Sequence, residues 1–126
     1  MNNEITRNKI TESLKAYYGN GSKDQMVTLA EHDNGDFTIT GEFHLWYEVD
    51  ADGMNEYTLN FSDSFGNEEQ YPFFVAPDAT FKDFVTGLCE FYNEKIELFY
   101  DNFCDQYPCN DGWAETENDL MTWQRI

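Results

Sequence analysis

The longest regular pattern of apolar and polar positions runs from Asp78 to Phe103 and predicts one amphipathic helix. Its apolar residues recur at steps of three and four, which is the spacing of one helix face. They are Phe81, Phe84, Val85, Leu88, Phe91, Tyr92, Ile96, Phe99 and Phe103. Five acids project opposite this face, within about 40° of one line at ~100° per residue. These acids are Asp83, Glu90, Glu94, Glu97 and Asp101.

A second pattern, with period two, predicts a strand over residues 37–49. Its apolar face carries Phe37, Ile39, Phe43, Leu45, Tyr47 and Val49. The opposite face is mostly polar and includes Trp46. A strand with one polar face belongs to a sheet that is covered on one side only. Gly41 interrupts the apolar face, so we expect either a β-bulge there or a helix that packs close to the backbone.

Turn signals on both sides of this strand predict an antiparallel meander. Asn34-Gly35 is a strong hairpin signal after a strand over residues 25–32. A three-residue turn over residues 52–54 would place Tyr57, Leu59 and Phe61 on the same face as the apolar residues before it. Residues 62–70 are expected to form a loop. Residues 71–75 are expected to form a short edge strand, because Pro72 limits pairing.

Helices are expected before the first strand and after the last strand in the chain order. Residues 3–18 predict a first helix capped by Asn2 or Asn3, and Asp78 is the expected cap of the long helix. Residues 105–126 are expected to be a less ordered segment or to contain a short helix over residues 116–124. The order α-β-β-β-(β)-α-(α) predicts a single α+β domain over residues 1–126, with a three- to four-stranded antiparallel sheet packed on one face by helices.

Charge sets this chain apart. Its 126 residues include 25 acids and 7 Lys or Arg residues, which gives a net charge of −18. Residues 24–81 contain no Lys or Arg. Such a charge repels nucleic acid and anionic membranes and attracts basic surfaces. The alternative explanation of this negative charge is solubility or halophilic adaptation.

Motifs for catalysis and metal binding are absent from the sequence. Neither His32 nor His44 lies in a triad signature, and Cys104 with Cys109 lacks the further ligands of a zinc site. The loop that begins at Asp50 departs from the EF-hand pattern. We therefore expect no catalytic residue, no metal and no cofactor. Three cysteines without an export signal, and no apolar run near ~18 residues, indicate a cytoplasmic protein outside the membrane.

The acidic stripe of the long helix suggests mimicry of nucleic acid. At ~1.5 Å per residue, the carboxylates of Glu90, Glu94, Glu97 and Asp101 follow one another every ~4.5 to 6 Å along a line. A basic channel that binds phosphates could accept this line, since Arg pairs with carboxylates much as it pairs with phosphates. Trp46 is a candidate aromatic anchor. The predicted loops add the candidate contacts Asp50, Asp52, Glu56, Asp63, Glu68 and Glu69.

In size, charge, lack of a targeting segment and element order, the chain resembles the small acidic inhibitors of phages and mobile elements, such as anti-restriction and anti-CRISPR proteins. It matches no motif of these proteins residue by residue. The resemblance implies a non-enzymatic inhibitor that occludes the DNA- or RNA-binding groove of a nuclease or another nucleic-acid-binding protein. An immunity protein against a basic toxin, and an enzyme that uses carboxylates or a metal, are the alternatives. The partner's identity, the oligomeric state and the relative weight of helix and loop acids stay open.

Overall fold

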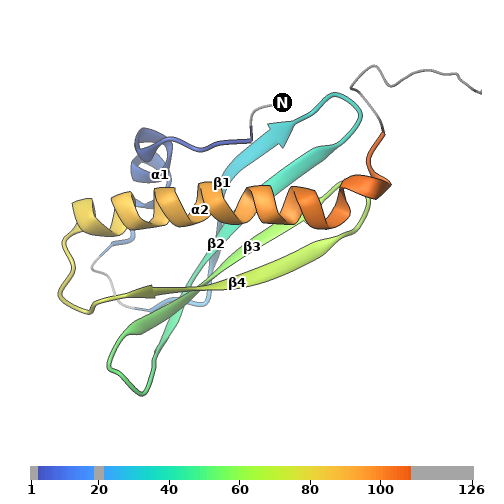
Figure 1. Cartoon of the computed structure of the whole chain (residues 1–126). Coiled ribbons are helices and arrows are strands. Elements are labelled where there is room, and N and C mark those ends of the chain that lie inside the picture. The colour runs from blue at the N-terminus through green and yellow to red at the C-terminus, as the bar shows by residue number, and fades with distance from the viewer. Residues whose placement is uncertain (1–2, 19–21, 109–126) are drawn as a thin grey trace, which may run out of the picture.

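A computed structural model describes residues 3–18 and 22–108 of the chain. Four antiparallel strands form one sheet in the order β1-β2-β3-β4, preceded by one helix and followed by another (Figure 1). The predicted α+β class and element order are therefore confirmed, with the fourth strand present. The elements are α1 (Arg7–Leu14), β1 (Met26–Asp33), β2 (Thr38–Val49), β3 (Asn55–Asp63), β4 (Glu68–Val75), α2 (Phe81–Phe103) and the 3₁₀ helix η1 (Cys104–Gln106).

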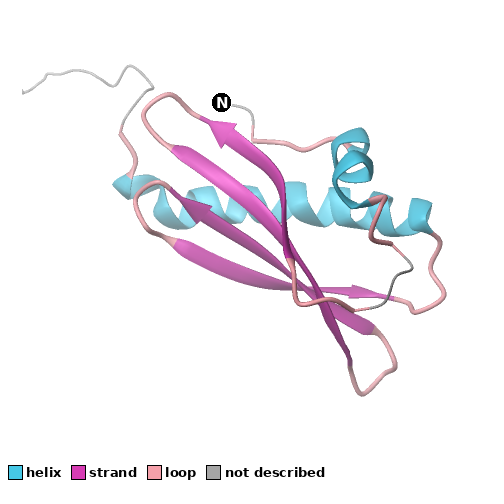
Figure 2. Cartoon of the chain, turned by 180° about the vertical axis from the view of Figure 1, so that it is seen from behind, coloured by secondary structure: helices cyan, strands magenta, loops and turns pink. Residues whose placement is uncertain are grey.

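The molecule has two layers. α2 lies across one face of the sheet, in front of it in Figure 1 and behind it in Figure 2. α1 packs beside α2 and against β1. No described helix covers the opposite face of the sheet, which is called the open face below. Within the described residues, no helix is long and apolar enough to cross a membrane.

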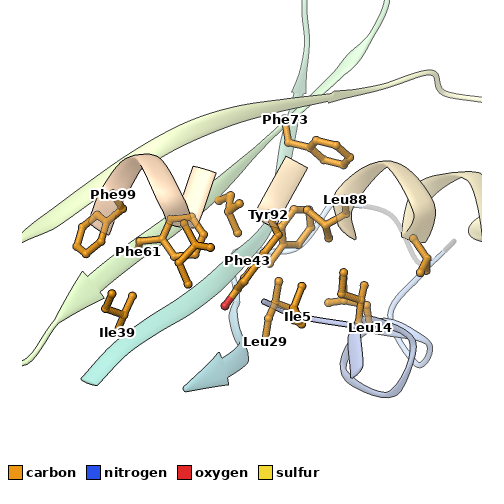
Figure 3. Packing of buried hydrophobic residues seen from close by; sticks show 14 of the residues in the cluster. Ile5, Leu14, Leu29, Ile39, Phe43, Phe61, Phe73, Leu88, Tyr92 and Phe99 are labelled. Carbon is orange, nitrogen blue, oxygen red and sulfur yellow. The ribbon is translucent and has the colours of Figure 1, made fainter. Parts of the chain in front are cut away.

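The core lies between α2 and the sheet, as the two apolar patterns predict (Figure 3). Phe61 of β3 meets Tyr92 of α2 edge to face, with ring centroids 4.9 Å apart and planes at 73°. Such aromatic pairs contribute about 0.5–1.5 kcal/mol beyond their area burial. The buried side chains of α2 are Phe84, Val85, Leu88, Tyr92, Ile96 and Phe99, and those of β2 and β3 that face them include Ile39, Phe43, Leu45, Leu59 and Phe61.

Gly41 allows α2 to approach the sheet closely. A Cβ atom at this position would collide with the Tyr92 hydroxyl group. The Tyr92 Oη atom in turn lies 2.6 Å from Nε2 of His32, which is buried on β1. Burial lowers the pKa of His32 and favours the neutral imidazole. Pairing of β1 with β2 also shifts register between Thr28 and Ala30, the partner of Gly41. The closely packed helix is therefore present, and the strand irregularity lies on β1 opposite Gly41 and not at Gly41 itself.

Both helices begin later than predicted. α1 is capped by Thr6, whose side chain accepts a hydrogen bond from the Lys9 N–H, and not by Asn2 or Asn3. The chain before α1 is held against α2, because Ile5 is buried and its N–H donates to Asn93 Oδ1 at 2.7 Å. α2 is capped by Thr80 instead of Asp78.

The hairpin tips differ from the predicted turns by one residue each. The Asn34 N–H donates to the Phe37 carbonyl, so Gly35 and Asp36 form the tip between β1 and β2. The Asp50 N–H donates to the Met54 carbonyl, so residues 51–53 form the tip between β2 and β3. The displaced turn and a register shift between His44 and Glu48 each change the β2–β3 pairing by an even number of residues, which leaves the faces of the strands unchanged. Leu59 and Phe61 therefore still face the core, as predicted.

The predicted loop over residues 62–70 is wrong. β3 continues to Asp63 and β4 starts at Glu68, so a tight turn joins two long strands. Gly66, with φ of 90°, and the side chain of Asp63 make this turn possible. β4 is an edge strand, as Pro72 indicated.

Tyr107 anchors the end of the described chain. It is buried and stacks on Phe37 with ring centroids 4.0 Å apart and planes at 13°. Its hydroxyl group donates to Asp63 Oδ2 at 2.8 Å. The predicted helix over residues 116–124, and Cys109, lie outside the described residues.

Candidate functional site

The acids predicted to form a stripe on the long helix lie on the outer face of α2, opposite its buried residues. Thr80 starts the helix because its side chain accepts a hydrogen bond from the Asp83 N–H at 3.1 Å. The apolar seam then fixes the rotation of the helix, so the opposite side points to solvent. All five acids of the stripe are exposed, namely Asp83, Glu90, Glu94, Glu97 and Asp101.

Few cations neutralise this surface. Among the described residues, the ion pairs are Lys95 with Glu94 at 3.9 Å and His44 with Asp24 at 2.9 Å, the second charged only when the imidazole is protonated. The Lys95 ammonium also lies over the Phe91 ring, 5.3 Å from its centroid. The remaining carboxylates of the stripe therefore face solvent without a bound cation from the described chain.

The hairpin between β2 and β3 divides its acids between structural and exposed positions. Asp50 Oδ1 accepts hydrogen bonds from the N–H groups of Asp52 and Met54, both at 2.9 Å, and so closes the loop. Asp52 is exposed at the tip, and Glu56 is exposed on β3. This hairpin projects away from α2 at the lower left of Figure 1.

Trp46 is exposed on the open face of the sheet. Its relative exposure is 47%, which is high for a large aromatic side chain. Its indole N–H donates to Glu48 Oε2 at 3.5 Å, a long hydrogen bond. Trp46 therefore has the exposure that an anchor residue needs, but it lies on the side of the molecule opposite α2.

All three acids of the hairpin between β3 and β4 accept hydrogen bonds from within the protein. The Asp63 carboxylate accepts from the N–H groups of Phe65 and Asn67, from Asn67 Nδ2 and from the Tyr107 hydroxyl group. Burial alone would raise the pKa of Asp63, but these hydrogen bonds outweigh it and lower the pKa.

Glu69, in the same hairpin, is half-buried on the α2 side of the sheet. Its Oε1 atom accepts from the Tyr71 hydroxyl group at 2.5 Å and from Asn102 Nδ2 at 3.1 Å. These bonds tie β4 to the end of α2. Glu68 is exposed on the open face.

The twelve predicted contact residues therefore do not form one continuous patch. α2 places five acids on one side of the two-layer molecule, while Trp46, Glu56 and Glu68 lie on the other side. Asp50, Asp63 and Glu69 mainly hold loops and strands together. The outer face of α2 carries the longest row of exposed carboxylates among the predicted residues.

Two features escaped the sequence reasoning. The first is a buried amide on the open face: Asn60 is 1% exposed, and its Nδ2 donates to Glu42 Oε1 at 3.3 Å and Glu68 Oε2 at 3.1 Å. The period-two alternation of β3 placed Asn60 on the polar face, but only the strand register brings it between two glutamates.

The second feature is a cavity of about 380 Å³ where the end of α1, the start of α2 and the ends of β2 and β3 meet. Tyrosine and phenylalanine side chains from β2, β3, α2 and the segment that follows α1 line it, together with Asn55 and Asp78. The sequence contained a signal, since tyrosines recur at residues 17, 18, 47 and 57. Their convergence depends on the packing of α1 against the sheet, which periodicity does not determine.

Metal-binding and nucleophilic groups are dispersed. Within residues 3–18 and 22–108, no group of three or more His, Cys, Asp or Glu side chains is placed to hold a metal ion. Cys89 donates to the Ile5 carbonyl at 3.4 Å, and burial raises the pKa of its thiol. A thiol with a raised pKa is a poor nucleophile at neutral pH.

Comparisons with known proteins give no family for this chain: no protein-family model matches it, and neither do any curated protein or any solved structure.

Proposed function

We propose that this protein is a nucleic-acid mimic that occupies the basic groove of a DNA- or RNA-binding protein, such as a nuclease, and thereby inhibits it. The observation that carries the proposal is the outer face of α2, where five exposed carboxylates follow one line and the only ion pair with another described residue is Lys95 with Glu94. From Asp83 to Asp101 this line is roughly 27 Å long at ~1.5 Å per residue. Non-enzymatic occlusion of the kind used by anti-restriction or anti-CRISPR proteins is the mode of action that this chemistry favours.

The physical basis is electrostatic complementarity. A groove that binds phosphates presents Arg and Lys side chains, and Arg forks pair with carboxylates as well as with phosphates. A net charge of −18 steers the approach to such a groove and increases the association rate by about 10- to 1,000-fold at low salt. The aromatic core fixes the backbone of α2 before binding, which reduces the entropy lost on association.

Capture from host lysate tests the proposal. The immobilised protein should retain nucleic-acid-binding proteins at low salt, and an excess of duplex DNA or RNA should elute them, because mimic and nucleic acid share one groove. Elution by salt but not by nucleic acid would contradict mimicry and leave only a nonspecific acidic surface. Mass spectrometry identifies the eluted proteins.

Two charge-matched variants test the role of α2. One variant changes Glu90, Glu94, Glu97 and Asp101 to Lys, and the control changes Glu31, Asp36, Glu48 and Glu56, all exposed on the sheet and its loops, to Lys. Each set takes the net charge from −18 to −10, since every reversal adds two units. We expect the α2 variant to lose the captured protein and the control to retain it. Equal loss in both variants would show that net charge, and not the row on α2, determines binding.

A further inference from the structure

The cavity at the end of the molecule has the size and the walls of a small-molecule site. Its volume of about 380 Å³ falls within the ~300–1,000 Å³ typical of ligand pockets. It is open to solvent beside the loop that joins β4 to α2, with Asp78 at its rim. Neither the acidic stripe on α2 nor the exposed tip residue Asp52 takes part in it.

Aromatic rings form a continuous wall in this cavity. The Tyr57 ring centroid lies 5.1 Å from that of Phe43, 5.0 Å from that of Tyr47 and 5.7 Å from that of Phe84. Tyr18 extends the wall, with its centroid 5.2 Å from that of Phe84. Aromatic faces carry the negative part of the ring quadrupole, so several rings around one space attract a cation within about 6 Å of their centroids.

Charge in the cavity favours the same class of ligand. Apart from tyrosines, Asp78 is the only ionisable residue among the described residues that line it, and none of them is Lys, Arg or His. The carbonyl end of α1 and the N–H end of α2 both lie nearby, and their partial charges oppose each other. An anionic ligand would be repelled by Asp78 and by the net charge of −18.

The tyrosine hydroxyl groups add acceptors without adding charge. Burial, and then the neighbouring Tyr47 and Tyr18, raise the pKa of Tyr57 to about 12, so its phenol is neutral at pH 7. Tyr18 donates its hydroxyl hydrogen to the Ala79 carbonyl. The hydroxyl groups of Tyr47 and Tyr57 have no hydrogen-bond partner within the described part of the chain, so their lone pairs are available to a ligand.

We propose that this cavity binds a small organic cation, with an alkylammonium group held between the faces of Tyr18, Tyr47 and Tyr57 and balanced by Asp78. This site is separate from the proposed inhibition by α2 and does not rest on it. The aromatic faces and the single acid distinguish a cation from a neutral apolar ligand, and this difference is what the experiment measures.

Choline and its neutral isostere 3,3-dimethyl-1-butanol are the probes, titrated into the full-length protein at about 0.15 M NaCl to screen the exposed acids. Tyrosine ring resonances in NMR spectra report the site. We expect saturable shifts at Tyr18, Tyr47 and Tyr57 with choline, and binding of the isostere at least about fivefold weaker. Equal binding of the two probes, or the absence of saturable shifts at these tyrosines up to about 50 mM choline, would overturn the proposal.

Variants separate the ring faces from the fold. Tyr47 is only half-buried, so Tyr47→Leu should fold and bind choline at least about fivefold more weakly, whereas Tyr47→Phe keeps the ring and should stay within about threefold. Asp78→Asn should weaken choline but not the isostere. Unchanged choline binding in Tyr47→Leu would contradict the aromatic site. The α2 charge-reversal variant should still bind choline, which separates failure of this proposal from failure of the proposed inhibition.

Discussion

The absence of a side chain at Gly41 determines how closely α2 and the sheet pack. Gly41 presents bare backbone to α2, and the Tyr92 ring fills the space that any other residue would occupy. Tyr92 cannot easily move away from Gly41, because it is fully buried and its hydroxyl group is 2.6 Å from His32 Nε2. The hydrogen bond matters here, since an unpaired imidazole or phenol in the core would cost about 1–3 kcal/mol.

We expect Gly41→Ala to destabilise the protein by about 1–3 kcal/mol, because the new methyl group forces Tyr92 away from His32 or moves the strand. Urea unfolding followed by fluorescence measures the change in unfolding free energy.

Gly87→Ala is the matched control for this substitution. Gly87 lies within α2, and a Cβ atom there would come no closer than 3.6 Å to the Phe73 ring, which is an ordinary contact. Alanine favours the helix over glycine by up to about 1 kcal/mol, so this variant should be equally stable or more stable. A Gly41→Ala variant as stable as Gly87→Ala would show that Tyr92 adapts freely.

At the scale of elements, tertiary contacts decide which of two equally good N-cap residues starts a helix. Both Asp78 and Thr80 are good N-cap residues, and the sequence alone favoured Asp78. The backbone turn at residues 76–79, with the Ala79 N–H bonded to the Ala76 carbonyl at 3.0 Å, delays the helix by two residues. Tyr18 then holds this turn through the Ala79 carbonyl, a contact 61 residues away in sequence.

Thr80→Ala should therefore lower the unfolding free energy by about 0.5–2 kcal/mol, because the Asp83 N–H loses its acceptor. Thr80→Ser should restore most of this loss. Asp78→Ala should stay within about 0.5 kcal/mol of the unsubstituted protein, since Asp78 is exposed and does not cap the helix. Chemical unfolding of the three variants distinguishes the two caps, and a larger loss for Asp78→Ala would reverse the assignment.

Periodicity predicted the elements well where a single face is buried. The seam of α2 and the alternation of β2 follow directly from apolar spacing, and the core residues Phe43, Leu88 and Phe99 are those that the pattern predicted. The prediction of a loop over residues 62–70 was wrong because polar composition does not distinguish a long loop from two strands joined by a tight turn. Asp63 supplies that turn with side-chain hydrogen bonds, which composition does not reveal.

For the molecule as a whole, the candidate surface was less predictable than the core. Acids of the helix and acids of the loops were predicted as contacts of the same partner, yet the core between the two layers puts Glu94 and Glu68 on opposite sides. This separation follows from the two apolar faces meeting, because each polar face must then point outward in its own direction. The aromatic cavity also required the full fold, since Tyr18 and Tyr57 come from different elements.

The net charge of −18 makes the stability of the whole molecule depend on salt. Few described carboxylates have a cationic partner, so their mutual repulsion opposes the compact state. Raising NaCl from about 0.02 to 0.5 M shortens the Debye length from roughly 20 to 4 Å and should screen this repulsion. We expect the urea midpoint to rise, with a gain of about 1 kcal/mol or more in unfolding free energy. The α2 charge-reversal variant, with a net charge of −10, should gain less unfolding free energy over the same salt range. An equal gain would indicate that sodium chloride acts through hydrophobic burial and not through charge.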